Sequence, residues 1–294
     1  MDKKVLLAGA AIVILLIIAV GFWQYQNVAG DNVEVAYLQV KGGSVEVNQG
    51  SGWASATDGM KLRSSDKVRT GADGSAAVVL FEGIIASLDP NTEVSVNEVS
   101  AGKTTIKLEA GSVWNKFAKV SGVSTYEVET PNAVATVRGT SFGVTYASEE
   151  TTMDVGDGNV EFGSTGGTHE TLGPGERATM KLGALKRAVL DRAGRLALAQ
   201  KLRQNLEDFK AARKKIILGF IERNRALVDQ LESQYPQLQE SRLDEFLNAA
   251  DAGQVNEDEL IQKSPMKLPI LYRLREMNQE VRAQMALIQQ YEGG

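Results

Sequence analysis

Three hydrophobic patterns follow one another along the 294-residue chain. A continuous apolar stretch comes first, then short β-prone runs separated by glycine, asparagine and aspartate, and last apolar residues spaced by three and four. The first pattern is typical of a membrane helix, the second of a β-domain and the third of long helices. The chain is therefore predicted to contain three regions, residues 1–28, 29–181 and 182–294.

The first region is predicted to anchor the chain in a membrane. Val5 to Trp23 carries no charge, and about 20 apolar residues in a helix are enough to cross a bilayer core. Two lysines precede this stretch and acidic residues follow it, which places the amino end in the cytoplasm. The residues that we expect within the anchor include Val5, Leu15, Ile18 and Trp23.

A cleaved signal peptide is the alternative, because residues 19–21 form a weak small-x-small cleavage site. We favour a retained anchor, since the apolar run is long and bulky aromatic residues follow it directly. In both cases everything after about residue 28 is expected to be exported. The predicted location is the inner membrane, with a single span and the bulk of the chain in the periplasm or extracytoplasmic space.

The second region is predicted to be all-β. Its short β-prone runs alternate with turn sequences such as ATDG, GADG and DPNT and show no helical periodicity. A recurring Gly-x-Val or Gly-x-Ala at the start of these runs indicates similar β-elements stacked on one another. A sandwich, a barrel or an irregular solenoid would fit. The expected strands include residues 43–47, 74–81, 111–117 and 158–162.

One stretch of this region, TPNAVATVRGTSFGV at residues 130–144, changes its alternation. Apolar residues occupy odd positions up to Val137 and even positions from Phe142 onward. Because a strand alternates faces with a period of two, this change indicates an inserted residue. We expect a β-bulge in a central strand, with Gly139 supplying the backbone freedom.

Arg138 stands at this change of phase. Its guanidinium is expected to satisfy backbone carbonyls, or a carboxylate such as Glu127 or Glu129, from a partly buried position. Binding of a partner by Arg138 is the alternative. The predicted structural motif consists of Arg138, Gly139, Thr140 and Phe142.

The third region is predicted to fold as helices. The longest stretch, residues 202–235, places leucine, isoleucine and phenylalanine on one face and ends before Pro236. Shorter helices are expected over about 238–252 and from Pro269 to about Tyr291, where proline suits the first turn. We expect the first and last helices to pack antiparallel in a hairpin or small bundle.

The apolar stripe of the last helix has two interpretations. It forms the core of the helical region, which is the commoner case, or it contacts another subunit as a coiled coil. In the second interpretation the partner-binding residues include Leu274, Met277 and Val281.

The amino-acid composition excludes several classes of protein and kinds of site. The net charge of −5 argues against a general nucleic-acid-binding protein, whose affinity depends on neutralising phosphates. The chain has no cysteine, and its single histidine, His169, lies in a glycine-rich stretch typical of a loop. These facts exclude a cysteine nucleophile and a multi-histidine metal site. We predict no enzymatic activity, no cofactor and no metal.

The ordered motifs of the β region resemble the FecR family domain across about Val40 to Met180. The resemblance rests on SGWASATDGMKL, KVRTGADGSAAVVLFEG, LDPNTEVSV, IKLEAGSVW, VETPNAVATVRGTSFGV, TMDVGDGNVEF and LGPGERATM, in this order. It implies an extracytoplasmic, mainly antiparallel fold, either an antiparallel sandwich or a flattened β-stack. The expected fold class is thus an all-β FecR-like domain after an N-terminal transmembrane helix, followed by an α-helical C-terminal region.

Regulatory members of that family carry a cytoplasmic anti-sigma segment before the membrane helix and read an outer-membrane transporter. Only four residues precede the apolar run here, so we do not expect this chain to hold a sigma factor itself. We predict a non-enzymatic binding or scaffold component of a cell-envelope assembly. Its expected partners are envelope proteins, in a homo- or hetero-oligomer, and the membrane, but no nucleic acid. A sensory, signal-transducing membrane protein is the alternative.

Overall fold

The computed structural model describes residues 36–293 apart from 119–121, 168, 224, 226–228, 230–239 and 264–268. The predicted membrane anchor, with Val5, Leu15, Ile18 and Trp23, lies outside the described residues and stays a prediction. Within the described ranges, no helix is both long enough and apolar enough to cross a membrane.

The chain divides into two compact units whose limits differ from the predicted boundary at residue 181. The β unit contains the described residues of Val33–Ala212 and Gln284–Gly294, and the helical unit contains those of Arg213–Ala283. The first part of the long helix and the end of the last helix therefore belong with the strands. These two helical segments pack against the sheet, which is why they belong to the β unit.

The described part of the β unit forms 16 strands. Their bounds are β1 (Ala36–Gly42), β2 (Val45–Asn48), β3 (Trp53–Ser55), β4 (Lys67–Thr70), β5 (Ser75–Leu80), β6 (Ile84–Leu88), β7 (Glu93–Val99), β8 (Thr104–Phe117), β9 (Tyr126–Glu129), β10 (Val134–Val137), β11 (Ser141–Ala147), β12 (Glu150–Asp157), β13 (Val160–Gly163), β14 (His169–Leu172), β15 (Glu176–Lys181) and β16 (Ala184–Val189).

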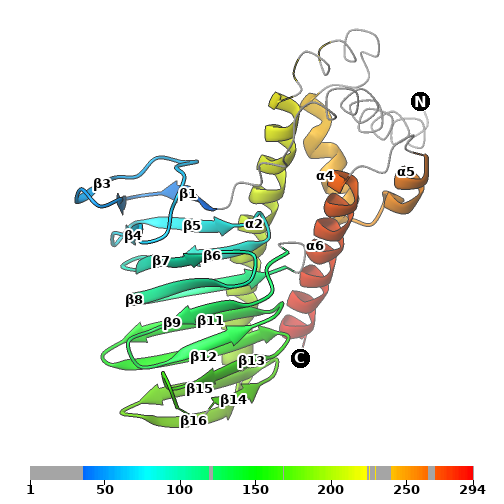
Figure 1. Cartoon of the computed structure of the whole chain (residues 1–294). Helices are drawn as coiled ribbons and strands as arrows, with labels where there is room; N and C mark the ends of the chain where they lie inside the picture. The colour runs from blue at the N-terminus through cyan, green and yellow to red at the C-terminus, as the bar shows by residue number, and fades with distance from the viewer. Residues whose placement is uncertain are drawn as a thin grey trace. The chain divides into compact units, whose positions relative to one another are not determined.

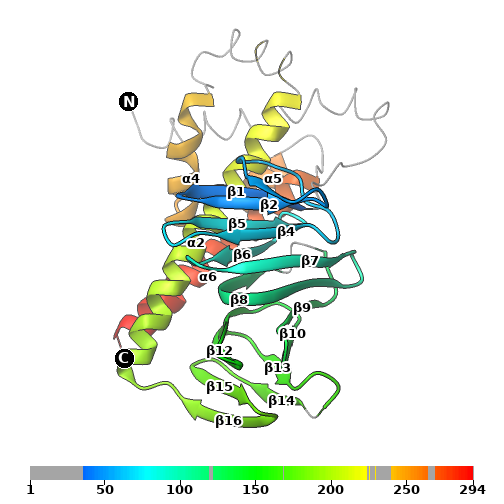
Figure 2. The same cartoon turned by 90° about the vertical axis from the view of Figure 1, so that its left-hand side faces the viewer.

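These strands build two layers, which are visible as a flattened stack in Figures 1 and 2. Layer A has the order β1-β5-β6-β8-β11-β12-β15-β16, and layer B has the order β3-β2-β4-β7-β8-β9-β10-β13-β14. The pairings are antiparallel apart from the parallel pair β8–β9. This arrangement confirms the expected β-domain of stacked, mainly antiparallel strands.

Strand β8 belongs to both layers. Its first half pairs with β7 and β9, and its second half pairs with β6 and β11. Gly111, with a φ of +91°, lies between the halves. A Cβ atom at this position would lie 2.4 Å from Thr92 Oγ1 and 2.6 Å from the Asn91 carbonyl oxygen. Only glycine fits this crossing without a shift of its neighbours.

The inner faces of the two layers form one hydrophobic core. Short strands such as β4 and β9 alternate buried and half-buried positions. The buried hydroxyl of Tyr126 donates to Asn115 Oδ1 at 2.7 Å. Burial raises the pKa of Tyr126, so the phenol keeps the proton that it donates. Core residues from both layers include Val78, Val94, Ile106, Val144, Val155 and Phe162.

The change of alternation at residues 130–144 is a corner between two strands, and the predicted bulge in one central strand is wrong. β10 lies in layer B and β11 in layer A, with residues 138–140 between them. Each strand points its own apolar set into the core, so the parity changes where the chain changes layer. Gly139, with a φ of +105°, does supply the left-handed backbone. The extra residue of the neighbouring irregularity is Gly156 in β12.

Layer A continues beyond the predicted boundary. A two-residue turn, Leu182-Gly183, has φ values of +49° and +76° and joins β15 to β16, and the first helix begins only at Arg192. The alanine, leucine and basic residues of β16 favour a helix intrinsically, but pairing across this tight turn keeps them extended. His169, predicted in a loop, is the first residue of the short strand β14.

The helices confirm the predicted helical region. Helix α6 begins at Pro269, as expected, and contacts α2 in antiparallel order. Gln284 Nε2 donates to the Leu202 carbonyl, and further along α2 the Arg213 guanidinium donates to Asn278 Oδ1. The helices of the described residues are α2 (Arg192–Arg223), the 3-10 turn η2 (Glu240–Arg242), α4 (Leu243–Asp251), α5 (Glu257–Lys263) and α6 (Pro269–Gly293).

A buried charged network connects the elements of the helical unit. The Arg213 guanidinium, 1% exposed, donates to the two carboxylate oxygens of Asp251 at 2.5 and 3.0 Å and to Asn278 Oδ1 at 2.7 Å. Glu257 accepts from Asn278 Nδ2 at 2.9 Å and from both terminal nitrogens of Arg282. Helices α2, α4, α5 and α6 are thus held by charge-assisted bonds that compensate the burial of the guanidinium.

Candidate functional site

The outer face of layer A is covered by α2. Strands β5 and β6 are buried at almost every position, without the alternation seen in the other strands. Their outward residues include Ala77, Val79 and Ile85, which are fully buried. On the helix, the buried apolar residues of this part are Leu198, Leu202, Leu206 and Phe209. Burying each large side chain contributes roughly 1.5–3 kcal/mol.

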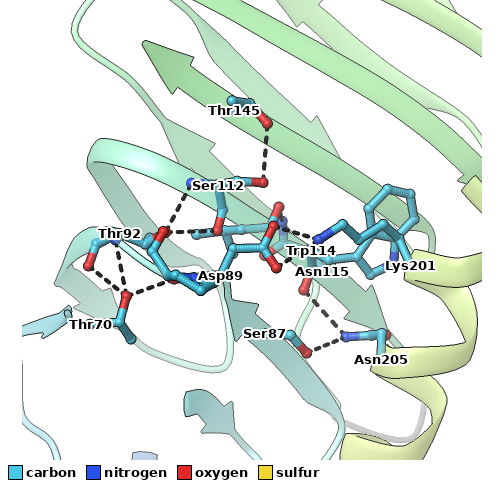
Figure 3. A network of polar contacts seen from close by, with 12 residues as sticks. Thr70, Ser87, Asp89, Thr92, Ser112, Trp114, Asn115, Thr145, Lys201 and Asn205 are labelled. Atoms are coloured by element: carbon cyan, nitrogen blue, oxygen red, sulfur yellow. Dashed lines mark hydrogen bonds and ion pairs between the residues drawn. The ribbon is translucent and has the colours of Figure 1, made fainter. Parts of the chain in front are cut away.

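Polar residues lie within this apolar contact and fix its register. We call them the helix–sheet seam: Lys41, Ser87, Asp89 and Trp114 of the strands and turns, with Lys201, Asn205 and Asp208 of α2. Each seam residue of α2 bonds to at least one seam residue of the sheet. Figure 3 shows how Lys201 and Asn205 reach from the helix to the strand residues.

Ser87 is the centre of the buried part of the seam. Its hydroxyl donates to Asp208 Oδ2 at 2.5 Å and accepts from Asn205 Nδ2 at 2.9 Å. Lys41 Nζ approaches the same Asp208 oxygen at 2.9 Å. Ser87, Asn205 and Asp208 are at most 5% exposed. A carboxylate this deeply buried depends on these donors, because an unpaired buried charge is strongly destabilising.

A second bond of the seam starts from the turn that follows β6. Lys201 Nζ lies 2.7 and 2.6 Å from the two carboxylate oxygens of Asp89. The turn itself is held by Thr70, whose hydroxyl donates to the Asp89 carbonyl at 2.6 Å (Figure 3). The Lys201 side chain is 40% exposed, so this pair orients the helix more than it stabilises it.

Trp114 lies flat on layer A because two neighbouring strand positions lack side chains. A Cβ at Gly143 of β11 would lie 2.4 Å from Trp114 Cε3, and one at Gly156 of β12 would lie 3.3 Å from Trp114 Cζ2. A Cβ at Gly156 would also lie 3.0 Å from Leu202 of α2. The Trp114 carbonyl accepts from Asn205 at 3.3 Å. We call the space for the Trp114 ring beside Gly143 and Gly156 the indole slot; at Gly156 it also borders Leu202 of α2.

The end of α6 adds a further contact to the β unit. The hydroxyl of Tyr291 donates to the Gly156 carbonyl at 2.8 Å, beside the indole slot. Burial raises the pKa of Tyr291, which keeps this donor protonated over the neutral range. The bulged strand β12 is thus held by α6 as well as by α2.

The structure places the predicted site residues differently from expectation. Arg138 is exposed, where a partly buried position was expected, and makes no hydrogen bond or ion pair within the described residues. Glu127 pairs with Lys103 instead, at 2.8 Å. Thr140 and Phe142 are buried in the β unit. A role of Arg138 in binding a partner stays a prediction.

The predicted stripe of α6 is largely covered within the chain. Met277 and Val281 are fully buried and Leu274 is half-buried. This fits the core interpretation, while a contact of these residues with another subunit stays a prediction.

Residues 139–143, GTSFG, have the G-x-S-x-G spacing of a hydrolase nucleophile, and their geometry does not suit that role. Ser141 is fully buried and is the first residue of β11, an antiparallel strand. A nucleophile elbow needs a strand-to-helix turn that exposes the hydroxyl. Over the residues that the structure describes, no group of three or more histidine, aspartate or glutamate side chains is placed to hold a metal ion.

The family described as FecR protein matches residues 66–161. This match lies within the segment on which the resemblance was based and confirms it. No curated protein matches the chain. The seam residues Ser87, Asp89 and Trp114 and both glycines of the indole slot fall within the matched residues, so the surface that holds α2 is part of the family domain.

Two crystal structures of a candidate anti-sigma factor from Parabacteroides distasonis ATCC 8503, at 1.65 and 2.50 Å resolution, are similar to this chain at 21% identity. The TM-scores are 0.40 and 0.39, and the alignments cover 46% and 45% of this chain. They cover 63% and 62% of the compared chains, so this chain spans less than two thirds of their length. A likeness of this extent carries no argument about function.

Replacing Gly143 with alanine is expected to destabilise the β unit. The added methyl group overlaps the indole of Trp114, and overpacking of this kind costs about 1–3 kcal/mol. Urea unfolding of the full chain, followed by circular dichroism and tryptophan fluorescence, measures the change. Gly42→Ala is the matched control, because nothing lies within 4 Å of its added Cβ, and it is expected to stay within about 0.5 kcal/mol. Equal stability of the two variants would contradict the indole slot.

Replacing Asp208 with alanine is expected to loosen α2 from the sheet. The change removes the acceptor of Ser87 and Lys41 and is expected to cost about 2–3 kcal/mol, since hydrogen bonds to a charged group are lost. Amide hydrogen exchange along α2 is expected to rise. Glu207→Ala removes the neighbouring carboxylate, which is 65% exposed, and is expected to change the stability by less than about 0.5 kcal/mol. If the amides of α2 exchange equally slowly in both variants, the seam does not hold the helix.

Proposed function

Because residues 66–161 form a FecR domain, we propose that this chain is a FecR-type regulatory protein of the cell envelope. The β unit binds a protein partner, and α2 relays the bound state. This is the transducer alternative of the sequence analysis, which the FecR match supports better than a purely structural scaffold. The protein acts without catalysis and without a cofactor.

The observation that carries the proposal is the helix–sheet seam. Ser87 and Asp89 belong to the FecR domain and bond directly to Asp208 and Lys201 of α2. A partner that shifts β6 or the turn after it must therefore strain or release these bonds. Interfaces fixed by discrete bonds respond by moving between alternative arrangements more readily than by continuous deformation. Helix α2 continues from the β unit into the helical unit, which makes it the direct path for such a change.

We further propose that residues 5–23 anchor the chain in the inner membrane. The lysines before this uncharged stretch favour an orientation with the amino end in the cytoplasm and both units outside.

In-cell photocrosslinking tests the binding of a partner. A photoreactive residue is introduced in turn at Arg138, Glu161 and Lys186, three exposed positions of the β unit. We expect an envelope protein to be captured from at least one position only after irradiation, and mass spectrometry identifies it. Capture of no other protein from all three positions would overturn the proposal.

The relay is tested with the captured partner. Its binding is expected to change amide hydrogen exchange around Lys201 and Asn205 in the wild-type chain, and to change it less in Asp208→Ala. A partner that binds without altering the exchange of α2 would favour the scaffold function over the transducer.

Cysteine labelling tests the membrane topology, because the natural chain has no cysteine to interfere. Single substitutions Lys3→Cys and Ser51→Cys are made in the full chain and treated with a membrane-impermeant maleimide. We expect Ser51→Cys to react in intact spheroplasts and Lys3→Cys to react only after lysis. Labelling of Lys3→Cys without lysis, or protection of Ser51→Cys, would contradict the topology.

A further inference from the structure

Strand β16 is an open edge of layer A. Among the described residues its one pairing partner is β15, and Figures 1 and 2 both show it as the last strand at one end of the stack. The two-residue turn before it pairs Lys181 with Ala184, and in such a hairpin these two residues exchange both backbone hydrogen bonds. Even-numbered residues of β16 therefore bond to β15, and odd-numbered residues point their backbone groups away from it.

An independent bond confirms this assignment. The amide of Leu190, the next even-numbered residue, donates to the Gly175 carbonyl at 2.8 Å. The outward amide and carbonyl groups then belong to Leu185, Arg187 and Val189. Within the described residues no backbone bond satisfies them on the open side. They form a template that a further extended strand can join.

Two exposed apolar side chains lie in β16 or in the turn before it. The large hydrophobic residues of the described chain that remain exposed are Leu182 at 87%, Val189 at 76% and Leu196 at 40%. All three lie in β16 or in the segments next to it. Single exposed apolar residues are ordinary. Leu182 and Val189, at the two ends of this edge strand, add apolar surface that a joining strand would cover.

The edge also carries an excess of positive charge. Between residues 181 and 192 there are four basic residues and one acidic residue, Asp191. Lys181 pairs with Glu150 at 3.1 Å and Arg187 with Glu176 at 2.6 Å. Lys186 and Arg192 are exposed and make no ion pair within the part of the chain that the structure describes. An acidic strand is therefore favoured at this edge.

The faces of β16 define the pattern of such a strand. Lys186 is on the outer face, whereas Leu185 packs against the core and shares its inner face with Arg187 and Val189. On the outer face a joining strand meets Lys186. On the inner face it meets Leu185 and Val189 on either side of Arg187, whose charge is already paired with Glu176. The matching sequence alternates acidic residues on the outer face with apolar residues on the inner face.

We propose that β16 binds an extended segment of a partner protein in which acidic and apolar residues alternate, by addition of this segment as a further strand of layer A. The inference rests on the proposed function and names the chemistry of its partner. A second copy of this chain fits less well, because edge-to-edge pairing would bring Lys186 and Arg187 close to their own counterparts, and like charges opposed across strands are destabilising.

The test uses a fluorescent synthetic peptide of alternating glutamate and valine and the full chain, with fluorescence anisotropy as the readout. Val189→Pro removes one outward amide, and its ring blocks the approach of a strand, while the bonds to β15 remain. It is expected to weaken binding at least about tenfold, equivalent to the loss of roughly one hydrogen bond. Val189→Ile keeps the amide and the apolar, β-branched side chain and is expected to bind like the wild type.

Charge is tested separately with Lys186→Glu and with a peptide of alternating lysine and valine. The wild type is expected to prefer the acidic peptide, and Lys186→Glu to lose this preference. Circular dichroism and thermal unfolding verify that each variant is folded. Because Lys186→Glu leaves every backbone group in place, it tests the inference even if Val189→Pro fails to fold.

Three results of the peptide experiments would overturn the inference. They are absence of binding of the acidic peptide, equal binding by the wild type and folded Val189→Pro, and equal binding of the two peptides. Self-association of the wild type that Val189→Pro abolishes would assign the edge to a second copy and overturn it too. The edge inference and the proposed function can fail independently of each other. Capture of a partner from Arg138 or Glu161 but not from Lys186 would contradict the edge inference and leave the proposed function standing.

Discussion

The constraint on which the β unit depends is the burial of one outer sheet face under a helix that is far away in sequence. Layer A exposes an apolar outer surface at β5 and β6, and such a surface is stable in water only when another element covers it. Helix α2 supplies the cover, and the bonds between Ser87, Asn205 and Asp208 select one position for it. The FecR domain and the first part of the helix are consequently one folding unit.

Much of the fold follows from the sequence because its signals are local. Turn residues, two-residue alternation and helical spacing are sufficient to predict the β-domain, the helices and the start of α6 at Pro269. The family motifs add the stacked arrangement. The unbroken apolar runs SAAVVL and IIASL also carry a signal that alternation alone misses, because strands buried on both faces need a covering layer.

The helix–sheet seam and the corner between β10 and β11 could not be predicted from the sequence, because both depend on residues that only the fold brings together. Asp89 in DPNT has the pattern of an ordinary turn residue, and only the fold brings Lys201 to it. The change of alternation at Gly139 looks like a bulge in the sequence. A bulge within one strand and a corner between two layers both move the apolar residues from odd to even positions. β16 has a helical composition, and its pairing with β15 outweighs that propensity.

Strand β8 has a consequence for how the β unit melts. Since one uninterrupted strand contributes hydrogen bonds to both layers, neither layer can lose its central pairing without damaging the other. We therefore expect the two layers to unfold together, in a single cooperative transition that includes β8. Any molecule that binds the native form of one layer protects the opposite layer to the same extent, because the stabilisation by mass action applies to the whole cooperative unit.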